Sequence, residues 1–197
     1  MKNSLRSIGI DDGYFPINYK GLKKRTLLAA VLCINHDVEN LALELVTVDG
    51  LDGTQKAVRA VKRVGEADIV FQDGVTIAGF NIVDPEELSA ETGMPVVVVF
   101  KHDLNLNKIY SALKKHFADW RERYEVISKV YSRSTAIPTP WRYIRITAVN
   151  IDVSRALSYM IKLQTVSPLP EPLRLADIVA SGLTKNTVLL KMINEEK

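Results

Sequence analysis

The sequence predicts an α/β protein built on one mixed sheet, with a three-stranded antiparallel meander followed by alternating helices and strands. Three apolar runs separated by turns predict the meander, at residues 7–10, 27–34 and 41–48. Beyond residue 52 the apolar spacing changes to that of a helix, and strand-like and helical segments then alternate. Such alternation is typical of parallel strands with helices packed on both faces of the sheet.

The first helix is expected to follow the meander directly. Apolar residues at positions 57, 58, 60, 61 and 64 share one helical face, and lysines and arginines occupy the other. Asp52 or Thr54 is the expected N-cap, and Gly65 ends the helix. A buried strand beginning at Ile69 comes next.

The remaining elements are predicted from caps, breakers and apolar runs. They are a helix from Asp84-Pro85 to Gly93, a strand at 95–100, a helix from Asn105 to about Arg123, strands at 124–131 and 141–148, a helix at 153–163 with Asp152 as its N-cap, and a short final helix at 173–181. Residues 132–140 are expected to form a polar loop. A single domain over residues 1–197 is the expectation from this length.

Charge, cysteine content and apolar runs limit the partners and the cellular location that the sequence allows. The formal net charge is +3, from 26 basic and 23 acidic residues, which neither requires nor excludes a nucleic-acid partner. The single cysteine, Cys33, lies in an apolar run and is expected to be a buried, inert thiol. No apolar run approaches the roughly 20 residues that span a bilayer, and the first residues lack a signal-peptide pattern. A cytoplasmic protein without a membrane partner is therefore expected.

Acidic residues follow several strands at the point where each strand ends. Asp and Gly close the runs at 7–13, 45–53 and 69–74. A carboxylate at the carboxyl end of a core strand stands where α/β sheets place their ligands, so these segments predict one shared acidic edge. The alternative is that each Asp-Gly pair is an ordinary turn, because Asp bonds its own backbone and Gly accepts a positive φ.

Four segments resemble those of endonuclease V, a family with the ribonuclease H-like fold. The segments are Gly9-Ile10-Asp11, the strand at 68–74 with Asp73-Gly74, the Gly-x-Pro strand at 93–101 ending in Lys101, and Leu-Pro-Glu-Pro-Leu-Arg-Leu-Ala-Asp at 169–177. Together they cover residues 7–182. As a whole, the sequence resembles an uncharacterised, mainly archaeal family related to endonuclease V.

The resemblance implies a metal-dependent nuclease that hydrolyses phosphodiester bonds of DNA or RNA. Asp11, Asp52 and Asp73 would be the catalytic and metal-binding carboxylates, which suit Mg²⁺ or Mn²⁺, and two such ions would flank the scissile phosphate. Asp52 stands where endonuclease V has a glutamate. Lys101 would contact a phosphate or a metal-bound water, unless it is an ordinary solvated side chain.

The chain also departs from endonuclease V. Residues 46–51 contain neither the tyrosine nor the prolines of the wedge that opens the duplex beside a deaminated base, and the late Gly-His pair is replaced at 149–152. A second hypothesis is therefore a catalytically weakened nucleic-acid-binding or adaptor protein on the same fold. The three histidines share no ligand spacing, which argues against zinc.

A basic, aromatic segment follows the first strand. Its candidate nucleic-acid-binding residues are Tyr14, Phe15, Lys23, Lys24 and Arg25. Aromatic rings stack on bases and basic side chains contact phosphates, so this composition fits nucleic-acid binding. A surface loop anchored by two aromatic residues explains it equally well.

Overall fold

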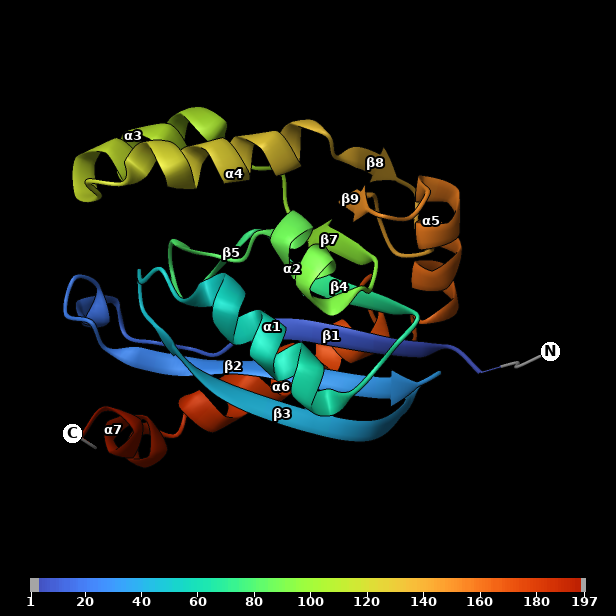
Figure 1. The fold of residues 1–197 in the computed structure, drawn as a ribbon, viewed down its shortest axis with the longest axis horizontal. Coiled ribbons are helices and arrows are strands. Elements are labelled where there is room, and N and C mark those ends of the chain that lie inside the picture. The colour runs from blue at the N-terminus through green and yellow to red at the C-terminus, as the bar shows by residue number, and fades with distance from the viewer. Residues whose placement is uncertain (1–3, 196–197) are drawn as a thin grey trace.

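A mixed sheet of seven strands organises the computed structural model, which describes residues 4–195. The strands of this sheet are β1 (Arg6–Asp12), β2 (Arg25–Ile34), β3 (Asp37–Thr47), β4 (Ile69–Asp73), β7 (Val96–Phe100), β8 (Thr135–Ile137) and β9 (Ile144–Val149). Their order in space is β3-β2-β1-β4-β7-β9-β8 (Figure 1). Two short strands, β5 (Thr76–Ile77) and β6 (Asn81–Ile82), form a separate ribbon.

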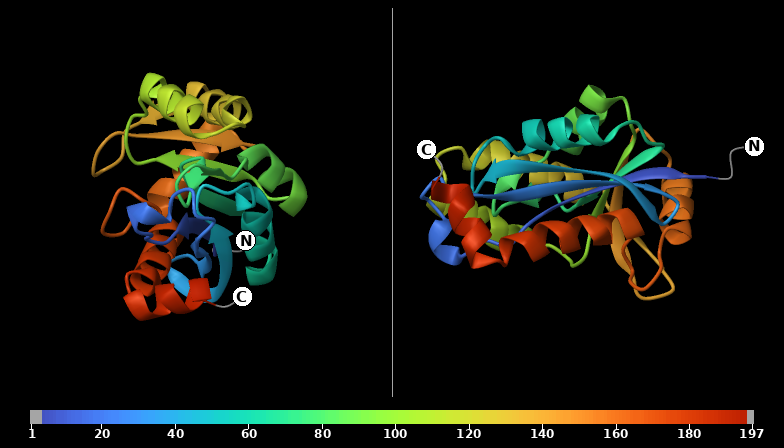
Figure 2. Two further views of the ribbon diagram at one scale, coloured as in Figure 1. Left: turned by 90° about the vertical axis from the view of Figure 1, so that its left-hand side faces the viewer. Right: turned by 90° about the horizontal axis from the view of Figure 1, so that it is seen from below.

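Helices cover both faces of the sheet. They are α1 (Gly53–Val64), α2 (Pro85–Thr92), α3 (Leu106–His116), α4 (Trp120–Ser132), α5 (Val153–Lys162), α6 (Glu171–Thr184) and α7 (Thr187–Glu195), with a 3-10 turn at Ile17–Tyr19. The right-hand view of Figure 2 shows α1 in teal on one side of the blue strands and α6 in red on the other. No helix within residues 4–195 is both long and apolar enough to cross a membrane.

The pairing confirms the predicted mixed sheet. β1, β2 and β3 form the antiparallel meander, and β1, β4 and β7 run parallel to one another. β9 is antiparallel to β7. The carboxyl ends of β1, β4 and β7 therefore meet at one edge of the sheet, as the sequence predicts, and this architecture is the ribonuclease H-like plan.

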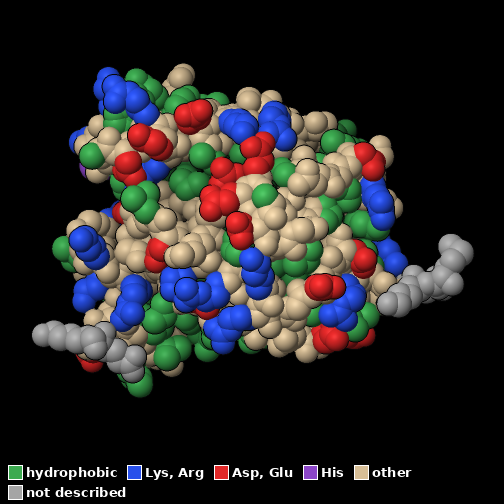
Figure 3. Space-filling model, in the orientation of Figure 1, with side chains coloured by type: hydrophobic (Ala, Val, Ile, Leu, Met, Phe, Trp, Pro, Cys, Tyr) green, Lys and Arg blue, Asp and Glu red, His purple; other side chains and the backbone are tan. Residues whose placement is uncertain are grey.

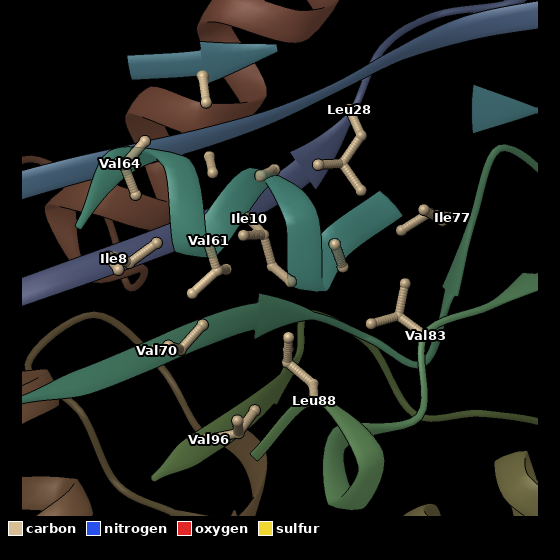
Figure 4. Close-up of a cluster of buried hydrophobic side chains, with 14 of the residues drawn as sticks. Ile8, Ile10, Leu28, Val61, Val64, Val70, Ile77, Val83, Leu88 and Val96 are labelled. Carbon is tan, nitrogen blue, oxygen red and sulfur yellow. The ribbon is translucent and has the colours of Figure 1, made fainter. Parts of the chain in front are cut away.

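The two faces of the sheet are packed by alternate residues of the same strands. On the α1 side, Ile8 and Ile10 of β1 and Val70 of β4 pack against Val61 and Val64 of α1 (Figure 4). On the opposite side, apolar residues of β4, β7 and β9 pack against α5 and the start of α6. Because neighbouring residues of a strand point to opposite faces, the parity of each position decides which side its carboxylate reaches.

Several segments differ from the prediction. Residues 132–140, expected to form a loop, contain the short strand β8, which pairs with β9. Residues 124–131 form the second half of α4 and not a strand, because Arg123, Ile127 and Val130 are buried at helical spacing on one face. The predicted single helix from Asn105 to Arg123 is broken at residues 117–119 into α3 and α4. The final helix is longer than predicted, and α7 follows it.

Candidate active site

Asp11, Asp73 and Lys101 come together at the carboxyl edge of the sheet. Asp11 lies near the end of β1, Asp73 ends the neighbouring strand β4, and Lys101 directly follows β7. The Lys101 Nζ atom lies 2.5 Å from Asp73 Oδ2 and 3.4 Å from Asp11 Oδ2. One ammonium group thus bridges two carboxylates that are 62 positions apart in the chain (73 − 11).

All three side chains lie on the α6 side of the sheet. In β4, Ile69 and Phe71 pack on that side, and Asp73 continues their alternation. In β7, Val97 and Val99 pack there as well, and Lys101 follows in the same phase. The alternation of buried strands therefore places the carboxylates and the lysine on one face.

Gly9 in β1 and Gly13 directly after it allow α6 to lie directly on this strand. A Cβ atom on Gly9 would lie 2.2 Å from the carbonyl carbon and oxygen of Pro172, at the start of α6. One on Gly13 would lie 2.4 Å from Thr184 Oγ1, at the end of α6. Asp11 lies midway between these glycines, so it faces the middle of α6, where Asp177 is located.

Asp177 is a carboxylate of this site that the sequence analysis missed as a site residue. Its charge contributes to raising the pKa of Lys101, and the Ser181 hydroxyl donates to its Oδ1 at 3.0 Å. The signal was present, because Asp177 closes the segment 169–177 that resembles endonuclease V. Within that segment, Glu171 and Arg174 pair with each other at the first turn of α6.

Burial and charge shift the pKa values of this cluster strongly. Burial and the charge of Asp73 raise the pKa of Asp11 well above its usual range, against the opposing effect of Lys101. Burial lowers the pKa of Lys101, but the charges of Asp11 and Asp73 outweigh it, and the net pKa is raised. Lys101 is therefore charged at neutral pH, and the crowded carboxylates favour additional positive charge.

Asp12 lies on the opposite face of the sheet from Asp11. Its Oδ2 accepts a hydrogen bond from the Ala78 backbone N–H at 2.8 Å. Burial raises the pKa of Asp12 to about 7, with a smaller contribution from the charge of Asp73. Asp12 thus ties the end of β1 to the turn between β5 and β6.

Asp52 and Asp49 accept hydrogen bonds on the α1 side. Asp52 Oδ1 accepts from the Thr47 backbone N–H and from Asn81 Nδ2, and its Oδ2 accepts from the Thr47 hydroxyl. Asp49 Oδ1 accepts from the Phe80 N–H. Asp52 stands at the N-cap position of α1, and its side chain makes no capping hydrogen bond there. Its role as a metal ligand stays a prediction.

The basic, aromatic segment has mixed surroundings. Tyr14 and Lys23 are exposed, whereas Phe15 packs against the core on the α1 side and Lys24 is half-buried. Arg25 begins β2, and its guanidinium donates to the Ile193 carbonyl oxygen of α7 at 2.5 Å. Of the five candidates, Tyr14 and Lys23 are therefore the exposed ones, while Arg25 contacts the C-terminal helix α7.

The donor set at the edge fits one hard cation. Asp11 Oδ2 and Asp73 Oδ2 both approach the same positively charged atom, Lys101 Nζ, so the two oxygens reach a common cation position. Carboxylate oxygens are the ligands that Mg²⁺ and Mn²⁺ prefer, and Mg²⁺ keeps several waters besides one or two carboxylates. In residues 4–195, no group of three acidic, histidine or cysteine residues is close enough to hold a metal ion.

Several known proteins are similar to this chain in sequence or in fold. A UPF0215 protein of Thermococcus sibiricus is 36% identical over 186 residues, which is 93% of this chain and 94% of the relative. A protein of unknown function from Archaeoglobus fulgidus superposes with a TM-score of 0.77 at 25% identity, over 90% of this chain and 97% of that one. Ciona intestinalis endonuclease V superposes with a TM-score of 0.60 at 13% identity, over 95% of this chain and 89% of that one.

That endonuclease V structure contains DNA with an inosine followed by a ribo-adenosine. At this level of identity the superposition establishes the ribonuclease H-like fold, as predicted. The sequence pattern of the family described as Endonuclease dU matches residues 3–184. The chain therefore belongs to the Endonuclease dU family, an archaeal group related to endonuclease V.

Proposed function

We propose that the protein is a metal-dependent endonuclease that hydrolyses phosphodiester bonds in nucleic acid. The observation that carries this proposal is the convergence of Asp11 and Asp73 on Lys101 at the carboxyl edge of the sheet. Two acidic side chains held beside one lysine supply cation ligands and a positive charge for a phosphate. The family match supports a nuclease-type function.

Each side chain has a distinct part in this proposal. Asp11 and Asp73 would hold a Mg²⁺ or Mn²⁺ ion, which when bound polarises a phosphoryl oxygen and lowers the pKa of water. Lys101, charged at neutral pH, would orient the phosphate and stabilise its developing negative charge. A second ion would need a further carboxylate, for which Asp177 of α6 is the candidate on the same side of the sheet.

Deaminated DNA is the substrate that the relatives suggest. The family name refers to dU, and the Ciona endonuclease V structure contains inosine. Residues 46–51 lack the aromatic wedge expected for endonuclease V. We propose that this chain cleaves DNA containing deoxyuridine and that Tyr14 and Lys23, the exposed members of the basic segment, contact the strand.

We do not propose a nucleic-acid contact for the lysines and arginines of α1. Basic side chains gather in the lower half of the face in Figure 3, where α1 and β3 lie. Lys56, Arg59 and Arg63 lie within 3.5, 3.7 and 3.1 Å of the buried Glu44 carboxylate. These cations compensate a buried charge of β3, which explains them without a nucleic-acid ligand.

The second candidate, a nucleic-acid binder with weakened catalysis, is favoured by one observation. Lys101 lies between the two carboxylates, where a metal ion would otherwise be bound. A site whose lysine replaces the ion would bind a phosphate but would not activate water. Metal affinity separates the two candidates, because a weakened site would show no Mn²⁺ binding by calorimetry.

The test is cleavage of end-labelled single- and double-stranded DNA and RNA, with and without deoxyuridine or inosine, in Mg²⁺ or Mn²⁺. We expect cleavage of deoxyuridine-containing DNA, and its loss with EDTA and in Asp73→Asn, which keeps the side-chain volume but removes a charge. Cleavage that persists in Asp73→Asn would refute the proposed site. Nucleic-acid binding without cleavage of any of these substrates would favour the second candidate.

A further inference from the structure

A cavity opens beside Lys101, on the side away from β1. Its volume is about 300 Å³, and its lining includes Lys101, His102, Asp103, Tyr143 and Arg145. The sheet register produces it, because Arg145 of β9 pairs with Phe100 at the end of β7. Since β9 is antiparallel to β7, the loop that precedes β9 lies next to the lysine of the proposed active site.

The cavity carries two positive charges and one negative charge. Lys101 and Arg145 line it together with the imidazole of His102, and the Asp103 carboxylate, whose side chain is 82% exposed, lies 4.0 Å from Arg145 Nε. Arg145 is fixed in place, because its Nε and Nη2 donate to the hydroxyl and carbonyl oxygens of Ser134, both at 2.9 Å. The guanidinium also lies over the Tyr131 ring. An oriented arginine beside a lysine and a histidine suits a phosphate group.

Two large aromatic side chains of the loop before β9 are exposed to solvent, and one of them lines this cavity. Tyr143, which lines it, is 74% exposed, and Trp141, two residues earlier, is 52% exposed. Their loop is held by Thr139, whose hydroxyl accepts from the backbone N–H groups of Trp141 and Arg142. The loop between β8 and β9 projects from the body of the protein (Figure 2). Exposed aromatic rings on a fixed turn are typical of binding surfaces.

We propose that this cavity, together with Tyr143 in its lining and Trp141 two residues earlier in the same loop, holds an unpaired nucleotide that flanks the phosphodiester bond at Asp11 and Asp73. We call this surface the strand platform: Trp141, Tyr143, His102 and Arg145. The backbone phosphate lies against His102 and Arg145, and the base stacks on Tyr143 or Trp141. The inference rests on the proposed function, since it extends the same edge of the sheet along a nucleic-acid strand.

Single-stranded nucleic acid fits this chemistry better than the alternatives. Base faces are available for stacking only where bases are unpaired, so a duplex would leave the aromatic rings without partners. An acidic peptide would match the cationic groups but would not use two exposed aromatic faces. The cavity volume is at the lower end for small-ligand pockets, which suits one nucleotide unit.

The first test is binding of a labelled eight-residue oligothymidine, measured by anisotropy on Asp73→Asn protein in EDTA. Alanine at both Trp141 and Tyr143 is expected to weaken binding about tenfold or more, the usual scale for lost base stacking. Tyr143→Phe keeps the ring and is expected to retain wild-type affinity. Lys62→Gln, which removes a charge on α1, controls for non-specific electrostatics. Unchanged affinity in the double alanine variant would overturn the strand platform.

The second test uses Trp141 itself as a probe. The sequence has two tryptophans, so Trp120→Phe leaves Trp141 as the single indole. Adding the oligothymidine to this variant is expected to quench its fluorescence, and adding the same sequence as a duplex is expected to quench it less. Equal quenching by poly-glutamate, or no quenching by the oligothymidine, would refute the proposal.

These binding measurements are independent of catalysis. A protein that cleaves DNA but binds the oligothymidine equally well without Trp141 and Tyr143 disproves the strand platform and leaves the nuclease intact. A protein that binds through these residues but cleaves nothing supports the strand platform and contradicts the nuclease.

Discussion

On the α6 side of the sheet, Asp11 and Asp73 direct their carboxylates to one lysine, whereas on the α1 side Asp49 and Asp52 accept hydrogen bonds from fixed donors. The sequence contexts are alike, since each of these aspartates lies near the end of a strand and close to a glycine. The difference lies in the partners. Asp73 pairs with the ammonium group of a lysine, while Asp52 accepts from one backbone and two side-chain donors.

The contrast supplies a physical criterion for separating the proposed metal-binding carboxylates from structural ones. A carboxylate whose oxygens accept from a backbone N–H and a buried amide is satisfied in place, and exchanging those donors for a metal ion would leave them unpaired. A carboxylate paired with a flexible ammonium group exchanges one cation for another. By this criterion, the proposed metal ligands are the strand-end aspartates on the α6 side of the sheet, and those on the α1 side are structural.

The largest expected effect is a difference in activity between Asp73→Asn and Asp52→Ala. Loss of a metal ligand removes several kcal/mol of transition-state stabilisation, so Asp73→Asn should lower the cleavage rate about 1000-fold or more. Its stability should change by less than about 1 kcal/mol, because the lost lysine contact is offset by reduced repulsion of Asp11. Cleavage rates and urea unfolding of both variants provide the measurement.

Asp52→Ala should show the reverse pattern. It leaves donors of Thr47 and Asn81 without acceptors, which should cost about 1–3 kcal/mol of unfolding free energy. Activity should remain within about tenfold of the unmodified protein at a temperature where the variant is folded. Complete loss of cleavage in folded Asp52→Ala would instead establish the metal-ligand role that the sequence predicts, and the comparison between the two faces would fail.

A smaller but still severe effect is expected from Gly9→Ala, which tests how the α6 side is assembled. The added methyl group would overlap the backbone of Pro172 and Leu173, so α6 must move away from β1. We expect a loss of about 1–3 kcal/mol in stability, as for other overpacked cores, together with reduced cleavage because Asp177 moves with the helix. Gly182→Ala is the control in the same helix, since nothing lies within 4 Å of its added Cβ. That substitution should stabilise the protein by up to about 1 kcal/mol.

The sequence predicts the approach of the residues on the α6 side better than the hydrogen bonds of the aspartates on the α1 side. Apolar runs and their Asp-Gly ends are local signals, so the meander, the parallel centre and the approach of Asp11, Asp73 and Lys101 follow from strand order and residue parity. The partners of Asp52 were not predictable, because Asn81 belongs to a two-residue strand that has no apolar pattern of its own. Asp177 reaches the site through the contact of α6 with Gly9, a long-range packing feature.

The error at residues 124–131 has a local cause, since a buried arginine, Arg123, hides the apolar face of α4.

The last expected effect concerns the pH dependence of stability and involves Asp12, which lies between the two environments. Its pKa is raised from the unfolded value near 3.8 to about 7, chiefly by burial. The folded state therefore binds more protons than the unfolded state between these values, and the stability that this group contributes below pH 4 is lost as pH rises towards 7. Asp12→Asn removes the titration, and its amide oxygen can still accept from the Ala78 N–H.

We therefore expect Asp12→Asn to gain stability over the unmodified protein progressively from pH 4 to pH 7, by a few kcal/mol at most, and to keep a constant advantage above pH 7. Urea unfolding in EDTA at pH 4, 5.5, 7 and 8 measures this difference without interference from metal binding. A difference that does not vary with pH would mean that Asp12 is ionised in the folded protein throughout this range. Asp12 would then share the solvent-like environment of an ordinary turn aspartate, and the α1 side of the edge would be less tightly closed than its hydrogen bonds indicate.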